Sequence, residues 1–343
     1  MLPVGTGGVA PALSGEALLE AVPEARDVAN LSVVQVANLP SMQLGLSHLR
    51  ETALQIEAAA DAGASGIVVV QGTDTLEEAA VALDHLVAYD LPVVLTAAMR
   101  SPRTSSADGP GNLLAAIRVA ALGRPWGQGV VVVMNDEIHA ARYVSKRHTV
   151  STAAFQSADV GPLGRVVEGV PRFAWTLPDA PRAIRRPIQD DRRVGVVALG
   201  MADDGALIEL GQQGGYHGLV VAAAGAGHAS LAATDRIEAA CRHIPIVVTS
   251  RTGAGLLLHA TYGYPGGEMD LADRGAILAL NAQPARLRMQ LLLLLSADYS
   301  IEEIRDFFRG LCCNGWAEAQ RAPGPRPIKR PESRTARRVM VPD

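Results

Sequence analysis

The sequence is poor in the residues that disulfide-bonded and membrane-spanning proteins depend on. It has three cysteines in 343 residues, and two of them, Cys312 and Cys313, are adjacent. Three thiols in this arrangement offer no disulfide framework and favour a reducing compartment. Apolar runs such as residues 291–295 are far too short to cross a bilayer. The N-terminus has no basic segment followed by a continuous apolar run, so we expect no signal peptide and a cytoplasmic location.

Net charge and aromatic residues are also scarce. A net charge of −4 at pH 7 argues against nucleic acid or an anionic membrane as the main partner. Aromatic residues make up only 4% of the chain, whereas 48% is hydrophobic, which is typical of helices and sheets with aliphatic cores. At this length the chain can form two domains, each with a core of its own.

The most informative stretch of the sequence lies around residue 72. Residues 66–70 are an apolar, mostly β-branched run that predicts a buried strand of a parallel sheet. The chain turns at Gly72, and a helix is expected from residue 75, with Glu77 in its first turn where a carboxylate suits the dipole. Because ligands bind at the carboxyl ends of such strands, Thr73 and Asp74 lie where a polar substrate would be held. An ordinary pair of helix-capping residues explains the same pattern equally well.

A resemblance favours the functional interpretation. The segment Gly72-Thr73-Asp74-Thr75-Leu76-Glu77-Glu78 resembles the second signature of the bacterial asparaginase/glutaminase family of amidohydrolases. Further segments follow in the order that the family has, and together they span most of residues 4 to about 311: Ala98-Met99-Arg100-Ser101-Pro102, Ser106-Ala107-Asp108-Gly109-Pro110, Val133-Met134-Asn135-Asp136, Val144-Ser145-Lys146, Gly161-Pro162-Leu163-Gly164 and Leu280-Asn281-Ala282-Gln283-Pro284-Ala285-Arg286.

The resemblance and the alternation of strands and helices imply a two-domain α/β fold. We expect a larger, flavodoxin-like N-terminal domain with a parallel sheet over residues 1–170, and a linker over 171–193. A smaller C-terminal α/β domain would span residues 194–313, followed by a disordered basic, proline-rich tail over 314–343. The strands expected in the two domains are 33–36, 66–71, 92–96, 129–134, 194–199, 219–222 and 244–249. The family usually forms tetramers of paired dimers, so the resemblance also implies a homo-oligomer with composite sites.

The sequence departs from the family at its first signature. That signature usually contains Thr-Gly-Gly-Thr, and its second threonine is the nucleophile, but here Val9 takes its place. Valine has nearly the shape of threonine without its oxygen. The lid that supplies an activating tyrosine is missing as well, because residues 10–16 lead almost directly into a helix. Thr6 and Ser14 are the nearby hydroxyls that could replace the nucleophile, although Ser14 fits better as a helix N-cap.

Lys146 matches the lysine that hydrogen-bonds the threonine of the Gly-Thr-Asp motif in the family. A lysine beside a hydroxyl and partly removed from water can act as a base. We therefore predict a catalytic group of Thr73, Asp74 and Lys146. Thr73 would be the nucleophile or position a water molecule, and Asp74 would orient a substrate amine or the lysine. Backbone N–H groups beside Gly72 would form an oxyanion hole, and no metal or organic cofactor is implied.

Three further positions correspond to contacts with the substrate in the family. Ser41 matches the serine that binds the α-carboxylate, whereas Met42 stands where a glutamine usually follows it. Methionine removes a donor and adds a flexible apolar wall, which argues against a small, doubly charged substrate. A backbone carbonyl near Ala98 would meet the substrate amide.

Two positions in the second domain match residues that reach a neighbouring subunit in the family. His228 replaces an asparagine in a Gly-x-Gly-Asn loop. Glu268 matches the glutamate that orients the lid tyrosine, and without the tyrosine it would either contact the substrate or remain as a charge on the rim.

These features predict an amidohydrolase that acts on an amide, a lactam or an amide intermediate rather than on free asparagine. A weak L-asparaginase is one alternative. The other is a catalytically inactive or non-hydrolytic protein that keeps the fold as a binding or scaffold subunit, which the loss of the nucleophile at Val9 favours and the retention of Thr73, Asp74 and Lys146 opposes.

Overall fold

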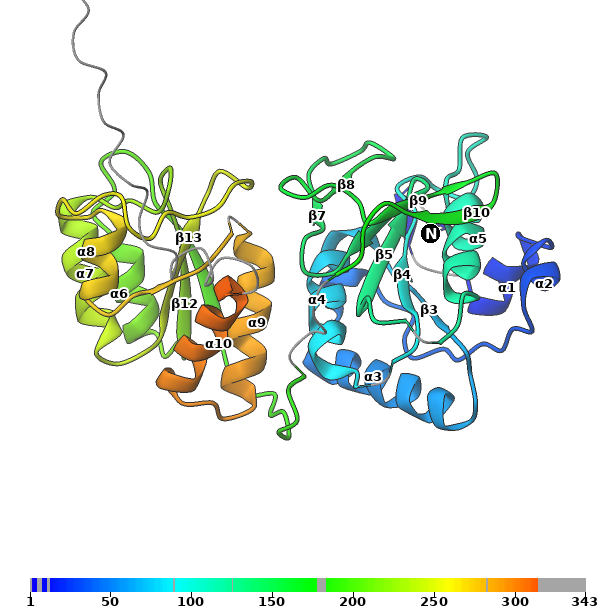
Figure 1. Cartoon of the computed structure of the whole chain (residues 1–343), viewed down its shortest axis with the longest axis horizontal. Coiled ribbons are helices and arrows are strands. Elements are labelled where there is room, and N and C mark those ends of the chain that lie inside the picture. Colours follow the sequence, from blue (N-terminus) through cyan, green and yellow to red (C-terminus); the bar gives the residue numbers. More distant parts are fainter. Residues whose placement is uncertain are drawn as a thin grey trace, which may run out of the picture.

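The computed structural model of the chain describes residues 2–4, 8–10, 13–88, 90–124, 126–177, 183–281 and 283–313, with side chains between residues 13 and 310. Within these ranges the chain forms two α/β domains that stand side by side, as Figure 1 shows. This is the two-domain α/β architecture that the sequence predicts.

The N-terminal domain is built on a six-stranded sheet with the strand order β10-β9-β6-β5-β4-β3. The strands β3, β4 and β5 are parallel to one another. The strands β6, β9 and β10 run antiparallel to their neighbours, so the sheet is mixed. Its strands are β3 (Ile67–Val70), β4 (Val93–Thr96), β5 (Val130–Met134), β6 (Glu137–Ala140), β9 (Gly164–Val167) and β10 (Val170–Phe173). Two separate antiparallel pairs join β1 (Leu2–Val4) to β2 (Gly8–Ala10) and β7 (Ser145–Lys146) to β8 (Phe155–Gln156).

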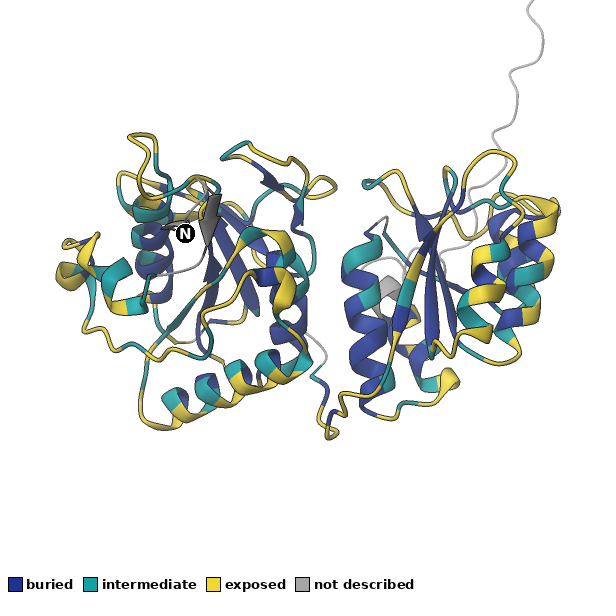
Figure 2. Cartoon of the chain, turned by 180° about the vertical axis from the view of Figure 1, so that it is seen from behind, coloured by how far each residue is buried: buried dark blue, intermediate teal, exposed yellow. Residues whose placement is uncertain are grey.

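Successive side chains of β4 pack into two different hydrophobic cores. Val93 and Leu95 pack in the core beneath α4 (Leu76–Leu86), whereas Val94 between them packs with α5 (Gly109–Ala120) on the other face. One apolar run can supply both cores because successive side chains of a strand point to opposite faces. Figure 2 shows these strands and the inward faces of the helices as buried. The other helices of this domain are α1 (Gly15–Glu20), α2 (Ala25–Val28), α3 (Leu46–Asp61) and the 3₁₀ helices η1 (Ser41–Gln43) and η2 (Thr73–Thr75).

The strand predicted at residues 33–36 is not formed. Residues 29–38 have no regular secondary structure, Val34 is 62% exposed, and Val33 lies so close to Gly15 that a β-carbon there would come within 2.5 Å of it. A β-branched segment becomes a strand only where a neighbouring strand accepts it, and Val33 packs on α1 instead. The outer edge of β3 is therefore unpaired among the described residues, and Val70 is 45% exposed, so the prediction of a buried strand at this position was wrong.

The segment expected as a linker is partly ordered into the two domains. β10 pairs with β9 over its whole length, so residues up to Phe173 belong to the N-terminal sheet. Farther along, the Ile184 N–H donates to the carbonyl of His85 in α4, and the Gln189 N–H donates to the carbonyl of Ser296 in α9. The described part of the linker is thus fastened to both domains. The predicted tail, residues 314–343, lies outside the described residues.

The C-terminal domain has a four-stranded parallel sheet with the order β11-β12-β13-β14. One face packs against α6 and α7, and the other against α9 and α10. A capping box opens α10, because the Glu303 N–H donates to Ser300 Oγ and Glu303 Oε2 accepts the Ser300 N–H. The elements are β11 (Val194–Ala198), α6 (Ala206–Gln213), β12 (Gly218–Ala223), α7 (Leu231–Cys241), β13 (Ile246–Ser250), α8 (Glu268–Asp273), β14 (Ile277–Leu278), α9 (Pro284–Ser296) and α10 (Ile301–Cys313).

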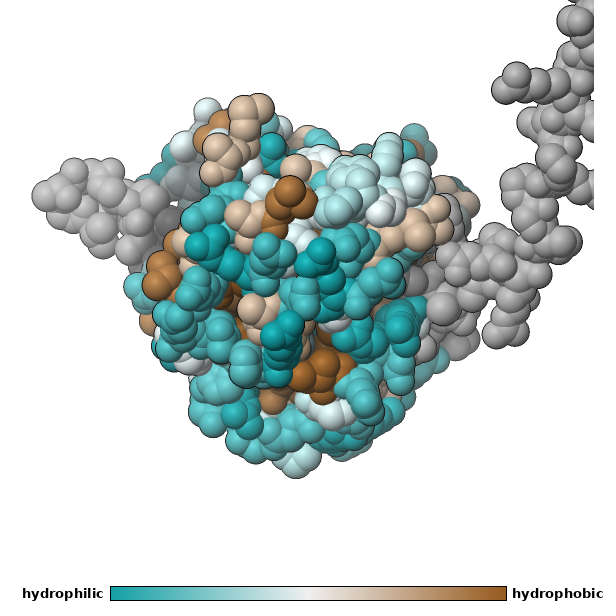
Figure 3. All heavy atoms as spheres, turned by 90° about the vertical axis from the view of Figure 1, so that its left-hand side faces the viewer, coloured by the Kyte–Doolittle hydropathy of each residue, from teal (hydrophilic) through white to brown (hydrophobic). Residues whose placement is uncertain are grey.

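The outer face of the C-terminal domain presents several apolar side chains to solvent. Leu207 and Leu210 lie one turn apart on α6, Leu231 begins α7, and all three are more than half exposed. Figure 3 shows the hydrophobic atoms on this side of the molecule as separate patches with hydrophilic residues between them. Scattered apolar residues are normal on protein surfaces, so the part of this face that the structure describes is not a continuous apolar interface.

Helices α4 and α9 join the two domains. The buried side chains of His85 in α4 and Gln290 in α9 form a hydrogen bond of 2.9 Å between their Nε2 atoms. Near the other end of α4, Arg288 Nη1 lies 3.3 Å from Glu78 Oε2. The start of α4, which follows Thr73 and Asp74, is therefore braced by the C-terminal domain.

Asp84 of α4 gives the N-terminal domain a pH-dependent stability. Its Oδ1 accepts the Val130 N–H at 2.7 Å. Burial raises the pKa of Asp84 to about 6, although Arg142 and the Val130 N–H oppose the rise. The folded protein thus holds this proton more tightly than the unfolded chain, so the contribution of Asp84 to stability is present below about pH 4 and is lost as the pH rises to about 6.

We expect Asp84→Asn to remove this change in the free energy of unfolding between pH 4 and pH 6. The free energy of unfolding of the variant relative to the wild type should rise between pH 4 and pH 6, by at most about 3 kcal/mol for a pKa difference of this size. Denaturant unfolding of both proteins at several pH values measures the difference. A difference that stays constant across this range would show that Asp84 titrates as it does in the unfolded chain.

Candidate active site

The turn after β3 places Thr73 and Asp74 at the start of a helix. Gly72 has φ −72° and ψ 155°, after which Thr73–Thr75 form η2 and lead directly into α4. Gly72 is tightly packed, since a β-carbon there would lie 3.0 Å from Ser41 Oγ. Neither Thr73 nor Asp74 is buried, because both face the solvent at the carboxyl end of the strand.

Lys146 reaches both residues from another part of the chain. It lies on β7, which pairs with β8, and its Nζ donates to Thr73 Oγ1 at 2.9 Å and to Asp74 Oδ1 at 2.6 Å. The Lys146 side chain is only 16% exposed, whereas that of Asp74 is 63% exposed. The structure thus brings together the three residues predicted as catalytic, with the amine shielded and the carboxylate turned toward water.

Asp74 and Lys146 border an open pocket of about 360 Å³, and Thr73 reaches it through its hydrogen bond to Lys146. Its lining consists of Asp74, Lys146, Arg147, His148 and Thr149. His148 Nδ1 accepts the backbone N–H groups of Val150 and Ser151, so this histidine stabilises its own turn. A hydroxyl with an amine at hydrogen-bond distance beside an open pocket can act as a nucleophile with its base, or can hold a water molecule that the amine deprotonates.

The positions matched to substrate contacts lie at the same end of the sheet, with different exposures. Ser41 is buried on η1 beside Gly72, and its carbonyl accepts the Thr75 hydroxyl at 2.9 Å. Met42 follows it with its side chain 70% exposed. Ala98 is exposed in the turn after β4, where Asp108 accepts the N–H groups of the next two residues.

The first signature falls largely outside the described side chains. Val9 lies on β2, where its backbone is opposite Pro3, but its side chain and Thr6 are outside the described residues. Ser14 is described, and its Oγ accepts the Ala17 N–H at 3.3 Å as the N-cap of α1. The prediction that Ser14 caps a helix is therefore confirmed.

His228 and Glu268 form a separate cluster in the C-terminal domain. Glu268 is fully buried, and its Oε1 accepts the N–H groups of Thr261 and Tyr262, both at 2.8 Å. His228 Nε2 lies 3.4 Å from Glu268 Oε2, and His228 Nδ1 lies 3.0 Å from the hydroxyl of Tyr264. Within the described residues, no hydrogen bond or ion pair joins this cluster to Thr73, Asp74 or Lys146.

The environment of Glu268 corrects one expectation. Burial opposes the charge of Glu268, but the N–H groups of Tyr262 and Thr261 and the neighbouring His228 outweigh it and lower its pKa. A fully buried carboxylate that holds a loop cannot be a solvated charge on the rim, so that alternative was wrong. Glu268 instead positions His228 and the loop at Thr261 and Tyr262.

Glu77, which the sequence predicts only as a carboxylate suited to the helix dipole, also contacts the strand that carries Lys146. In the structure Glu77 Oε2 accepts the backbone N–H of Lys146 at 3.2 Å. The signal in the sequence was its place in the same motif as Thr73. What the sequence could not show is that residues 77 and 146 meet.

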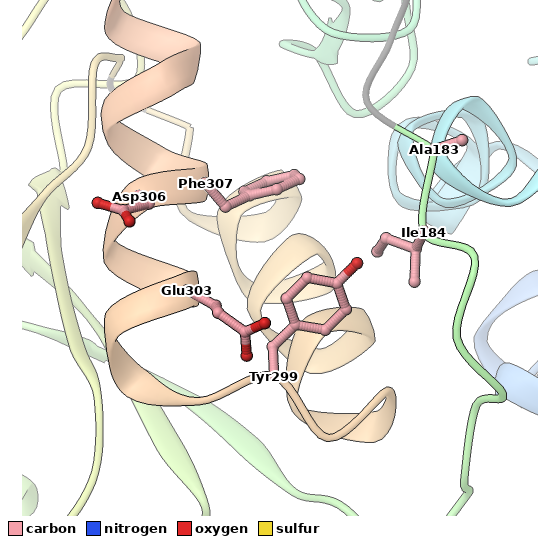
Figure 4. Close-up of a pocket in the computed structure, with 6 residues that line it drawn as sticks. All are labelled: Ala183, Ile184, Tyr299, Glu303, Asp306 and Phe307. Carbon is pink, nitrogen blue, oxygen red and sulfur yellow. The ribbon is translucent and has the colours of Figure 1, made fainter.

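A second pocket, of about 330 Å³, lies between the linker and α10. Figure 4 shows the rings of Tyr299 and Phe307 facing Ile184, whereas the Asp306 carboxylate points away. The Arg186 guanidinium stacks on the Tyr299 ring, 4.1 Å from its centroid, and pairs with Glu303. This pocket shares no lining residue with the pocket beside Lys146.

Within the described ranges, no group of three or more His, Cys, Asp or Glu side chains is arranged to hold a metal ion. No helix in those ranges has the length and apolar character needed to cross a membrane.

Known proteins share the whole two-domain arrangement. Residues 4–179 match the profile of the family described as Asparaginase, N-terminal, and residues 193–308 match that of the Glutaminase/Asparaginase C-terminal domain. The fold and the two family matches define an amidohydrolase of the asparaginase type.

Individual relatives agree with this class. A probable L-asparaginase of Deinococcus radiodurans is 38% identical over 321 residues, which is 89% of this chain and 94% of that protein. L-asparaginase 2 of Bacillus subtilis is 33% identical over 85% of this chain and 77% of its own length. The crystal structure of a probable cytoplasmic L-asparaginase from Campylobacter jejuni superposes with a TM-score of 0.79 at 29% identity, covering 90% of this chain and 95% of that one. The chain therefore belongs to the asparaginase family and is a hydrolase acting on carbon–nitrogen bonds other than peptide bonds.

Proposed function

We propose that this protein hydrolyses a small-molecule amide with Thr73 and Lys146 as its reactive pair. The observation that supports this most strongly is the 2.9 Å contact between Lys146 Nζ and Thr73 Oγ1 at the edge of an open pocket. Lys146, once unprotonated, accepts the proton of the Thr73 hydroxyl, and the oxygen attacks the amide carbonyl. The lysine then returns the proton to the leaving nitrogen as the C–N bond breaks, and water hydrolyses the acyl group.

Thr73 could instead position the attacking water while Lys146 deprotonates it. In both forms Asp74 orients the lysine, to which it is hydrogen-bonded at 2.6 Å. The backbone N–H groups at the start of η2 lie at a helix N-terminus, where they would stabilise negative charge on the carbonyl oxygen.

The substrate is proposed to be larger or less charged than free asparagine. Val9 lacks the hydroxyl of the usual nucleophile, and the exposed Met42 replaces a donor for the α-carboxylate. Both changes favour an amide, a lactam or an amide intermediate with an apolar portion that can lie against Met42. L-asparagine is the second candidate, since the relatives from Deinococcus radiodurans and Bacillus subtilis are named L-asparaginases.

A panel of amides tests this proposal. L-asparagine, L-glutamine, succinamate and nicotinamide would be assayed by ammonia release, and 2-pyrrolidinone by mass spectrometry of the ring-opened product. Turnover of at least one compound that Thr73→Val abolishes supports the proposal. Failure to turn over any amide in a broad library would favour a non-hydrolytic binding or scaffold role instead.

We also propose a cytoplasmic homo-oligomer, a dimer or a tetramer, in which His228 and the loop that Glu268 holds complete the pocket of a neighbouring subunit. The separation of the His228 cluster from Lys146 within one chain is consistent with such sharing. Light scattering at working concentration should give a mass of two or four chains. A monomer under assay conditions would contradict the composite site.

A further inference from the structure

The strand that carries Lys146 is held by side chains from both domains. Ser145 is buried, and its hydroxyl donates to Gln283 Oε1 at 2.5 Å, just before α9 begins. Gln283 Nε2 in turn donates to the carbonyl of Gly253 at 2.8 Å, and Arg147 Nη1 donates to the same carbonyl at 2.5 Å. Both neighbours of Lys146 in the chain are thus tied to the C-terminal domain.

Glu77 holds Lys146 itself from the N-terminal domain. Its Oε2 accepts the Lys146 N–H at 3.2 Å. Glu77 is also a second acceptor for the Ser145 hydroxyl, whose one hydrogen it shares with Gln283 Oε1. Glu77 lies one turn after Thr73, at the start of α4. One helix start therefore presents the Thr73 hydroxyl and fixes the backbone from which its partner amine extends.

Arg286 is the buried cation of the C-terminal domain that acts on Glu77. It lies in the first turn of α9 with only 4% of its surface exposed. Burial raises the pKa of Glu77, and the charge of Arg286 is the strongest of the groups that oppose this rise; Arg147 also opposes it. Burial in turn lowers the pKa of Arg286 to about 10, against the effect of Glu77 and Asp159. Glu77 and Arg286 thus each favour the ionised form of the other.

We propose that Glu77, Ser145, Gln283 and Arg286 form an interdomain clamp that positions Lys146 against Thr73, so that the C-terminal domain of each chain fixes the base in its own N-terminal domain. Lys146 Nζ lies at the end of a flexible side chain, and a displacement of about 1 Å in a reacting group can lower a rate about 100-fold. The clamp residues act through Lys146 and are positioning residues. The inference rests on the proposed role of Lys146 as the base.

A neighbouring ion pair provides a matched control. Glu78 is the next residue after Glu77, and it pairs with Arg288 of α9 at 3.3 Å. This pair also joins α4 to α9, yet neither residue has a hydrogen bond to Lys146 among the described contacts. Glu78→Met and Arg288→Met therefore remove an ion pair between the domains and leave the hydrogen bonds of the clamp in place.

The kinetic test uses the fastest amide of the panel above. Glu77→Met removes the acceptor and should lower kcat about 100-fold with KM changed by less than about threefold. Glu77→Gln keeps an acceptor oxygen and should restore most of that loss. Arg286→Met, in the other domain, should lower kcat in the same way, while Glu78→Met and Arg288→Met stay within about twofold of the wild type. Equal losses in the Glu77 and Glu78 variants would show that only the interface matters and would overturn the proposal.

A readout independent of activity separates this inference from the proposed function. Lys146 and Lys329 are the only lysines in the chain, so lysine labelled with ¹³C gives two side-chain signals, and Lys146→Met identifies the first. Glu77→Met and Arg286→Met should shift the Lys146 signal and leave that of Lys329 in place. An unmoved Lys146 signal in both variants overturns the clamp even if Thr73 and Lys146 prove catalytic. A shifted signal in a protein that hydrolyses no amide would retain the clamp and reject the proposed function. If either variant fails to fold, Ser145→Ala, which removes only a hydroxyl, takes its place.

Discussion

Thr73→Val is expected to lower the rate of amide hydrolysis by three or more orders of magnitude. The change removes the hydroxyl that accepts a hydrogen bond from Lys146 Nζ, while the volume of the side chain stays almost the same. Removing the nucleophile or the group that positions water typically causes losses of this size. The measurement is kcat/KM from ammonia release with the fastest amide of the panel, alongside a thermal melt to verify the fold.

Thr52→Val is the control for this variant. Thr52 lies on α3, and its hydroxyl donates only to the carbonyl of His48 one turn earlier, so the same substitution there should leave the rate unchanged. If Thr73→Val keeps wild-type activity, the chemistry lies elsewhere, and Thr6, Ser14 and His228 would be the next residues to replace.

L-asparagine and L-glutamine should be turned over several orders of magnitude more slowly than by an asparaginase with a complete site. The resemblance implies that three groups are missing: the hydroxyl at Val9, the donor at Met42 and the tyrosine of the lid. Nucleophiles and oriented donors each contribute two or more orders of magnitude in typical enzymes. Steady-state kinetics with both amino acids, compared with the best amide of the panel, give the ratio.

The variant Val9→Thr gives a second test of the prediction that asparagine is a poor substrate. The new hydroxyl would still lack a tyrosine to activate it, so the variant should gain little asparaginase activity. Efficient hydrolysis of L-asparagine by the wild-type protein would refute the prediction and favour the second candidate substrate. A large gain from Val9→Thr alone would show that the site has another group able to activate a threonine there.

The sequence predicts most of the strands and helices because their signals are local. The runs at β4 and β5 are almost wholly apolar and each follows a helix, and both form where the pattern places them. The segment at residues 33–36 is also rich in valine but forms no strand, since its pairing depends on a partner far away in the chain. The conversion of β3 into an edge strand follows from that loss, and no pattern within residues 66–71 could have indicated it.

The sequence likewise predicts some residues of the candidate site and not the contacts of others. Thr73, Asp74 and Lys146 were found through the motifs around them, and the structure joins their side chains. The contact of Glu77 with the Lys146 backbone and the burial of Arg286 depend on how the two domains pack, which composition and spacing do not encode. For Glu268 the sequence allows an exposed position that the structure excludes. A carboxylate beside a glycine-rich loop suggests exposure to solvent, whereas the N–H groups of that loop enclose it.

The most direct test of the account is a double-mutant cycle on Thr73 and Lys146. Both Thr73→Val and Lys146→Met remove the polar function at nearly constant volume, and kcat/KM would be measured for each single variant, the double variant and the wild type with one amide. Groups that act as one unit are strongly non-additive, so the double variant should be little slower than either single variant. If the two losses in activation free energy simply add, Thr73 and Lys146 act independently and the proposed mechanism is wrong.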